Sequence, residues 1–230
     1  AGAIAKKLLG TIGVEVLAHT VQIGNVKLSR EVSYDDIRQN VYSNPVRCAD
    51  QETASAMRNE IWEASAAGDS VGGIVEGLAL NVPAGLGDPI FDSLDCDIAK
   101  MLFNVPAVKG VEFGSGFRSV SLRGSENNDP YVLKEGKIVT LTNNAGGILG
   151  GISTGMPIMV RVAFKPTSSI PKRQRTVDLS RMVETEIEFK GRRDPCVVPR
   201  AVPVVESCLA LVLADHAIRA GKIPRTLDKE

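Results

Sequence analysis

The sequence predicts an α+β fold with a largely antiparallel β-sheet core and flanking helices. Helix-forming patterns dominate the first half of the chain and strand-forming patterns dominate the second. The two kinds do not alternate in the strict order of parallel βαβ folds. With 230 residues, 43% of them hydrophobic, the chain can bury a substantial core. We therefore expect a single domain over residues 1–230 that ends in a charged tail at residues 221–230.

The helices expected in the first half are marked by their start and stop residues. Ser33 precedes two acidic residues at 35 and 36 and is typical of a helix N-cap. Apolar residues between 51 and 67 recur at helical spacing, and Gly68 is a suitable stop. The elements expected in this half are a helix over 1–9, a strand pair over 14–26 with a turn at Gly24–Asn25, helices over 33–42 and 51–67, a strand over 72–80 and a helix over 91–103.

The second half is expected to contain mainly strands, followed by one final helix. Strand-like patterns occur over 108–113, 118–122, 137–142, 156–164 and 183–189. The final helix, 203–220, is apolar on nearly all sides, so we expect it to be buried in the core or in a subunit interface. Gly221 and Pro224 end this helix.

Composition argues against several classes of function. The chain has 27 Lys/Arg, 27 Asp/Glu, only 4% aromatic residues and no continuous basic run, so nucleic-acid binding is not expected. No apolar run approaches the roughly 20 residues of a membrane span. The four cysteines form no CxxC pair, which argues against zinc and indicates reduced thiols in the cytoplasm. His19 and His216 stand alone and are expected to be structural or at the surface.

Charge is unevenly distributed along the chain. Residues 161–200 contain ten Lys/Arg against five Asp/Glu, whereas residues 31–100 contain four against thirteen. This distribution is typical either of a cationic pocket for a polyanionic ligand or of salt-bridged surfaces and subunit contacts.

The most informative segment is the glycine-rich stretch 143–153, with the sequence NNAGGILGGIS. Its four glycines within six residues let the backbone approach a flat or charged ligand closely. A lysine and hydroxyl side chains follow in Lys165–Ile170. The chain contains neither a GxxxxGK[ST] motif nor the third glycine of the dinucleotide-binding pattern, which argues against P-loop and Rossmann domains. Together the two segments predict a site for a phosphorylated cofactor.

Pro166 favours an extended conformation at Lys165. If the segment stays extended, Lys165, Thr167 and Ser169 share one face, which suits a phosphate or a ribityl chain. The alternative interpretation is a polar loop that caps a strand.

Pro195 has a similar effect on the segment before it. It favours an extended Asp194, so that Arg192 and Asp194 point the same way and Arg193 points oppositely. An arginine beside a carboxylate forms either a structural ion pair or a proton-handling site.

Several long motifs occur in a characteristic order. They are AGAIAKKLL, GDSVGGIVE, PAGLGDPIFDSLD, AVKGVEFGSGF, GSENND, NNAGGILGGISTGMPI, KPTSSI, TVD, KGRRDPC and VPRAVPVVE. In this order they closely resemble the chorismate synthase family, from Ala1 to about Ala217. The resemblance implies the β-α-β sandwich of that family, truncated at its N-terminus, with this chain as the C-terminal portion.

The resemblance also implies an activity and its partners. Chorismate synthases are cytoplasmic homotetramers that convert 5-enolpyruvylshikimate 3-phosphate to chorismate and phosphate in the shikimate pathway, which leads to the aromatic amino acids. The reaction is an anti-1,4-elimination without net redox change, and it uses reduced FMN. The phosphate and the two carboxylates of this substrate would explain the basic surplus of residues 161–200.

Site residues follow from the same resemblance, motif by motif. Asp194 matches the catalytic acid near flavin N5, and Arg192 matches an arginine that binds flavin or substrate. The residues that match the family's FMN contacts are Pro106, Ala107, Gly150, Lys165, Pro166, Thr167, Ser168 and Ser169.

Two features depart from the family pattern. Arg193 stands where the family usually has the histidine of KGRHDPC. The family's two catalytic histidines precede the AGAIAKKLL motif, and neither His19 nor His216 lies in a matching motif. If the chain is complete as given, we expect a flavin site open on one side and little or no elimination activity. The alternatives are an inactive C-terminal fragment that only binds FMN or phosphate or oligomerises, and a generic anion-binding α+β domain.

Overall fold

The computed structural model describes residues 1–191, 193–224 and 226, and it confirms the α+β class. The contacts within the chain divide it into two compact units, and the single domain over residues 1–230 stays a prediction. The first unit contains residues 1–19, 75–163 and 201 onward, and the second contains residues 20–74 and 164–200. Half of the charged tail 221–230, residues 225 and 227–230, lies outside the described residues.

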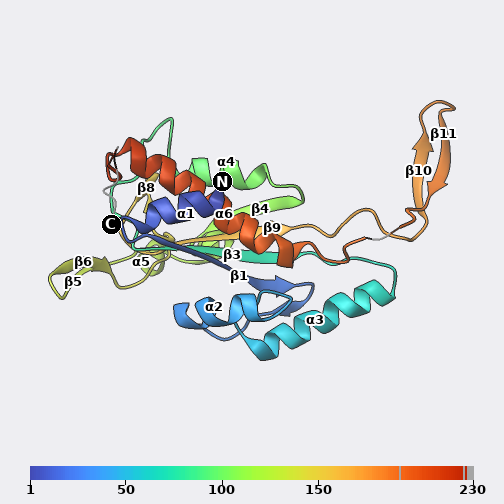
Figure 1. Cartoon of the computed structure of the whole chain (residues 1–230), viewed down its shortest axis with the longest axis horizontal. Coiled ribbons are helices and arrows are strands. Elements are labelled where there is room, and N and C mark those ends of the chain that lie inside the picture. Colours follow the sequence, from blue (N-terminus) through green and yellow to red (C-terminus); the bar gives the residue numbers. More distant parts are fainter. Residues whose placement is uncertain (192, 225, 227–230) are drawn as a thin grey trace. The chain divides into compact units, whose positions relative to one another are not determined.

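The largest sheet has five strands in the order β2-β1-β3-β9-β4 (Figure 1). Its strands are β1 (Glu15–Ile23), β2 (Val26–Lys27), β3 (Gly73–Leu80), β4 (Val108–Phe113) and β9 (Ile158–Phe164). β1 and β2 pair antiparallel around the expected turn, with Ile23 opposite Val26. Antiparallel pairs also form between β5 (Tyr131–Lys134) and β6 (Lys137–Thr140), between β7 (Ile148–Leu149) and β8 (Ile152–Ser153), and between β10 (Gln174–Asp178) and β11 (Val183–Ile187).

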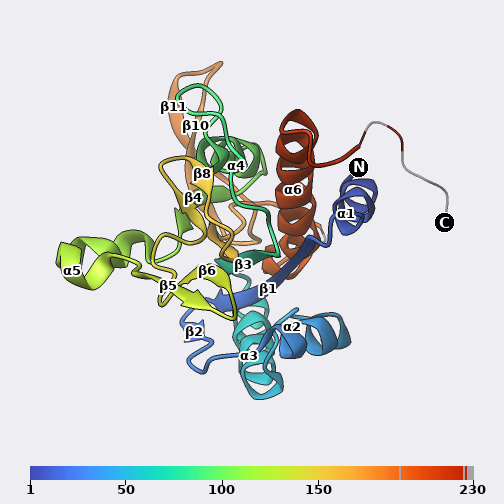
Figure 2. The same ribbon diagram turned by 90° about the vertical axis from the view of Figure 1, so that its left-hand side faces the viewer.

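Three helices pack on the strands of the first unit: α1 (Gly2–Gly10), α4 (Leu94–Phe103) and α6 (Val198–Arg219, with its first turn in the second unit). α1 and α6 lie side by side (Figures 1 and 2), joined by an ion pair of 2.8 Å between Lys6 and Glu206. Gly77 on β3 lets α6 approach, because a Cβ there would lie only 3.0 Å from Val205 Cγ1. Fully buried side chains of this core include Leu9, Leu94, Ile98, Leu102, Val160, Leu209 and Leu213.

Helix α6 is longer than the sequence analysis expects. It begins five residues before Pro203, which lies inside the helix. With 22 residues and a mean hydropathy of 1.7, it is long and apolar enough to cross a membrane by length and composition, which corrects the expectation that no stretch reaches this size. However, 61% of its apolar window is buried inside the protein, as in a core helix. This burial agrees with the expected core position.

In the second unit, two helices begin at side-chain caps. α2 (Tyr34–Asn40) begins after Ser33, which forms the expected capping box with Asp36, and a 3₁₀ turn, η1 (Val41–Ser43), follows it. α3 (Gln51–Ala66) begins after Asp50, whose Oδ2 accepts hydrogen bonds from the Thr53 amide at 2.8 Å and hydroxyl at 2.6 Å. Both helices lie at the positions that the sequence predicts.

We expect Asp50→Ala to lower the free energy of unfolding by about 1–2 kcal/mol, because the substitution removes the N-cap of α3. Hydrogen bonds from Thr53 hold the pKa of Asp50 below its ordinary value of 3.8. The contribution of Asp50 is therefore fully present above that value and is lost as the pH falls through the lowered pKa. Urea unfolding measures the change, and Glu52→Ala, at an exposed position in the same turn, is the control. Equal stability of the two variants would contradict the capping role.

Two predicted elements differ from the structure. Residues 118–122 are not a strand: Gly116–Ser121 form the 3₁₀ helix η2, because the Glu112 carboxylate accepts a hydrogen bond from Phe117 N at 3.1 Å and bonds from residue i+3 to residue i follow. α4 begins at Leu94 rather than near Phe91, since Asp88 and Asp92 bond to each other through their backbones. β5, β7, β8, β10 and the short helix α5 (Gly124–Asn127) were not predicted.

Candidate functional site

In the first unit, the glycine-rich stretch forms a tight loop that continues into the β7–β8 hairpin. Gly147 has a φ of 80°, and a Cβ there would lie 2.5 Å from the backbone oxygen of Pro157. Gly150, at the tip of the hairpin, has a φ of 60° and is open: a Cβ there would meet nothing within 4 Å. Close packing therefore requires glycine at position 147. At position 150 the absence of a side chain leaves the backbone of an exposed turn accessible.

The carboxylate of Asp129 accepts hydrogen bonds from residues at the start of this loop. Asp129 Oδ1 accepts hydrogen bonds from the Thr142 hydroxyl at 2.7 Å and from Asn144 N at 2.8 Å. Its Oδ2 accepts a third from Ala145 N at 2.8 Å. Burial alone would raise the pKa of Asp129, but these hydrogen bonds bring it below its ordinary value of 3.8. Sequence analysis did not identify this residue, although it ends the GSENND motif.

Pro106 and Ala107 form the connection between α4 and β4, also in the first unit. Pro106 is exposed, and Ala107 has a φ of 74°, a left-handed conformation that non-glycine residues seldom adopt. Such strain occurs preferentially at ligand-binding positions. The binding role of Pro106 and Ala107 stays a prediction.

In the second unit, Lys165–Ser169 follow the end of β9 as an irregular segment with a bend at Ser168. Lys165, Thr167 and Ser169 are half-buried, while Pro166 and Ser168 are exposed, which agrees with the predicted shared face. Within the described part of the chain, the Lys165 ammonium contacts only the Pro166 carbonyl, at 3.3 Å. The hydroxyl oxygen of Thr167 is buried and has no hydrogen-bond partner there. An unpaired cation and an unsatisfied hydroxyl thus lie two residues apart.

Asp194 and Ser169 line one small cleft of the second unit, together with Asp69, Ser70 and Arg193. The Asp194 carboxylate lies 2.7 Å from the Arg200 guanidinium. The predicted partner Arg192 lies outside the described residues. The side chain of Arg193 is exposed, and its guanidinium lies 5.6 Å from the centre of the Phe189 ring. The structure therefore brings together Ser169 and Asp194 from two predicted motifs.

Part of the basic surplus of residues 161–200 is neutralised by the protein itself. Arg161 bonds to Glu76 at 3.0 Å and to Glu112 at 2.6 Å, all in the first unit. In the second unit, Lys172 pairs with Asp69 at 2.6 Å. The salt-bridge interpretation of the charge pattern is thus right for these cations, whereas Lys165 has no anionic partner among the residues that the structure describes.

Both histidines are buried in side-chain networks of the first unit. His19 Nε2 lies 3.2 Å from Glu76, and His216 Nε2 lies 2.9 Å from Asp97. Each histidine has a carboxylate partner, as expected of structural residues.

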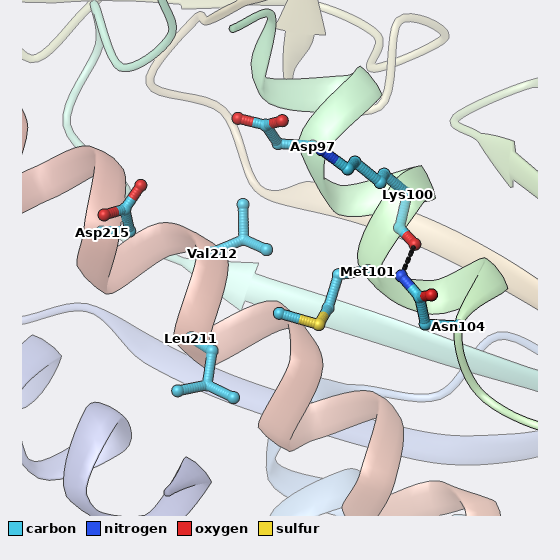
Figure 3. A pocket seen from close by; sticks show the side chains of 7 residues that line it. All are labelled: Asp97, Lys100, Met101, Asn104, Leu211, Val212 and Asp215. Carbon is cyan, nitrogen blue, oxygen red and sulfur yellow. Dashed lines mark hydrogen bonds between the residues drawn. The ribbon is translucent and has the colours of Figure 1, made fainter.

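Figure 3 shows a separate pocket between α4 and α6. Met101, Leu211 and Val212 form its apolar part, and Asp97, Lys100, Asn104 and Asp215 form its polar part (Figure 3). None of the described residues predicted to bind a cofactor lines it. We therefore do not assign the predicted function to this pocket.

These features define an α+β protein whose glycine-rich loop is held by hydrogen bonds to the Asp129 carboxylate. In its second unit, Lys165 has no anionic partner among the described residues and lies near the hydroxyl groups of residues 167–169. The chain belongs to the chorismate synthase family: the sequence model described as "Chorismate synthase" matches residues 1–218. This finding confirms the family that the ordered motifs indicate.

Individual proteins and a solved structure support the same family. A chorismate synthase of Methanosarcina barkeri is 53% identical over 227 residues, which cover 98% of this chain and 62% of that protein. One from Korarchaeum cryptofilum is 55% identical over 220 residues, covering 96% and 61%. A crystal structure of chorismate synthase superposes with a TM-score of 0.79 at 32% identity, over 95% of this chain and 61% of that one. The chain thus spans about three fifths of the length of these relatives.

Proposed function

We propose that the protein is a lyase that converts 5-enolpyruvylshikimate 3-phosphate to chorismate and phosphate with the help of reduced FMN. The observation that carries this proposal is family membership over residues 1–218, with relatives more than 50% identical. A homotetrameric, cytoplasmic enzyme is proposed on the same ground. The alternative proposal is a fragment that binds FMN or phosphate, or oligomerises, without turnover.

The described residues suit a flavin mononucleotide chemically. The unpaired ammonium of Lys165 suits a phosphate, and the unsatisfied Thr167 hydroxyl suits a phosphate oxygen or a ribityl hydroxyl. Gly150 offers backbone that a flat ring can approach, since no neighbouring atom occupies the place of its missing Cβ. We propose Pro106, Ala107, Pro166, Ser168, Ser169 and Arg192 as further flavin contacts on the basis of the family.

The proposed roles in the reaction follow from charge and position. Reduced flavin, when bound, supplies electron density transiently as phosphate leaves the substrate. Asp194 is the proposed proton-handling group, and its carboxylate forms an ion pair with Arg200 at 2.7 Å. Arg192 is the proposed contact of anionic groups of flavin or substrate.

An anaerobic assay with reduced FMN and 5-enolpyruvylshikimate 3-phosphate tests the activity. Chorismate is detected by its ultraviolet absorbance and phosphate by a colorimetric assay. Formation of both in equal amounts supports the lyase. Saturable FMN binding without either product supports the FMN-binding fragment, whereas the absence of both FMN binding and product contradicts the lyase and the FMN-binding fragment and leaves a fragment that binds phosphate or oligomerises.

We expect Arg193→His to change the FMN dissociation constant by less than about twofold, which corresponds to about 0.4 kcal/mol. Arg193 lines the same cleft as Asp194 and Ser169, but its side chain is exposed and its guanidinium lies over the Phe189 ring, so we expect it to stabilise the loop rather than the cofactor. Flavin fluorescence titration measures the affinity. A tenfold change would show that position 193 faces the flavin.

A further inference from the structure

The carboxylate of Asp129 is the centre of the contacts that shape the glycine loop. It accepts three hydrogen bonds, two of them from the consecutive backbone amides of Asn144 and Ala145. Hydrogen bonds to an ionised carboxylate are stronger than those between neutral groups. Within the described part of the chain, Asp129 is the acceptor for both amides. These contacts link residues about fifteen positions apart and fix the entry into the glycine stretch.

The loop beyond Ala145 has little room to move independently of this entry. A Cβ on Gly146 would lie 2.3 Å from Gly114 N, so the two backbones are in close contact. Asn143 bonds to Gly147 N at 2.8 Å and to the Pro157 carbonyl at 2.8 Å. A shift at residues 144–145 must therefore displace Gly146 and Gly147, which lead directly into the β7–β8 hairpin and Gly150.

We propose that Asp129 is a positioning residue for the flavin: its carboxylate holds residues 144–145 in place and thereby sets the position of the bare backbone at Gly150. This inference rests on the proposed function. It does not require Asp129 to touch the cofactor. The ionised state is essential, because a carboxylate presents acceptors to both amides, whereas a carboxamide presents one acceptor and one donor group.

Asp129→Asn is the main test. The substitution preserves shape but places an NH₂ group against a backbone N–H, so at least one of the three bonds is lost. We expect the FMN dissociation constant to rise roughly tenfold or more, as for loss of one hydrogen bond to a charged group. We also expect faster hydrogen exchange at the Asn144 and Ala145 amides and a shift of their NMR signals, effects that a general loss of stability would not confine to this loop. The chain's melting transition should stay cooperative.

Two further variants serve as a milder test of the Asp129 contacts and as a control. Thr142→Val removes only the hydroxyl bond to Asp129 and should weaken flavin binding by a smaller factor, about threefold. Asp178→Asn is the matched control, because Asp178 also accepts bonds from two backbone amides and a hydroxyl, those of Ser180 and Arg181, in the β10–β11 turn. We expect its effect on FMN affinity to be below twofold. Should Asp129→Asn fail to fold, Thr142→Val carries the test against the same control.

The outcomes distinguish this inference from the proposed function. The inference about Asp129 is overturned if the wild-type chain binds FMN and Asp129→Asn binds it equally well, with unchanged hydrogen exchange at the Asn144 and Ala145 amides. The proposed function would be unaffected by that result. Weakening by Asp178→Asn as large as that by Asp129→Asn would also overturn it. Absence of FMN binding by the wild-type chain would overturn both.

Discussion

Gly147→Ala is expected to lower the free energy of unfolding by roughly 3 kcal/mol. The backbone at Gly147 has a φ of 80°, which an alanine adopts only with strain. The added Cβ would also lie 2.5 Å from the Pro157 carbonyl oxygen, and this atom belongs to backbone that cannot rotate away. Strain and steric overlap act together, so the change exceeds the usual effect of a glycine substitution.

Gly150→Ala provides the matched control, because it has a similar φ of 60° but open space around the added methyl group. We expect it to cost only about 1 kcal/mol of stability and to weaken FMN binding, since the methyl group stands where the ring would approach. Urea unfolding and flavin titration of the two variants separate the effects. If Gly150→Ala destabilised the chain as much as Gly147→Ala, steric contact with Pro157 would not be the cause.

Arg161→Leu is the second substitution with a large expected effect. Arg161 on β9 lies between Glu76 on β3 and Glu112 on β4, and it also donates to the Gly114 carbonyl at 3.0 Å. Removing the guanidinium leaves two partly buried carboxylates without their shared cation. The expected loss is about 3 kcal/mol, the lower end of the range for a broken buried ion pair, because the Arg161 side chain is 30% exposed.

Burial alone would raise the pKa of Glu76, but the hydrogen bonds and charges of His19 and Arg161 bring it below its ordinary value of 4.5. The stability that ionised Glu76 supplies is therefore present above that value and is lost as the pH falls through the lowered pKa. In Arg161→Leu the pKa of Glu76 should be lowered less, so both this contribution and its loss in acid should become smaller. Arg173→Leu is the control: its side chain is 76% exposed beside Glu186, and we expect a change within about 0.5 kcal/mol. Comparable losses in the two variants would refute the role of the Arg161 network.

Sequence reasoning predicts elements whose signals are local. The N-cap at Ser33 and the helical spacing after residue 51 predict α2 and α3 without help from distant residues. The strand expected at 118–122 is wrong, because the alternating pattern does not reveal that the Glu112 carboxylate, five residues before Phe117, accepts a hydrogen bond from the Phe117 amide where the 3₁₀ helix begins. The start of α6 is missed because a proline at 203 suggests a first turn, although the helix accommodates Pro203 in its second.

The candidate site likewise contains features that the sequence predicts and contacts that only the structure shows. Motifs locate Gly150, Lys165 and Thr167, and proline spacing predicts the shared face that the burial pattern supports. No pattern in the sequence reveals that Asp129 clasps residues 144–145 or that Arg200 pairs with Asp194, since both contacts depend on the tertiary fold. The spacing of the glycines also does not show that Gly147 is needed for close packing against the Pro157 backbone, whereas Gly150 has open space around its Cα.

The central claim is that this chain carries a flavin site of the chorismate synthase family. It is tested most directly by anaerobic titration of the 230-residue chain with reduced FMN, beside the variant Lys165→Ala, whose ammonium has no anionic partner among the described residues. The account predicts saturable binding to the wild-type chain and a dissociation constant roughly tenfold higher for the variant, as for loss of one charged contact. No saturable binding by the wild-type chain, or equal affinity of the two proteins, would contradict it.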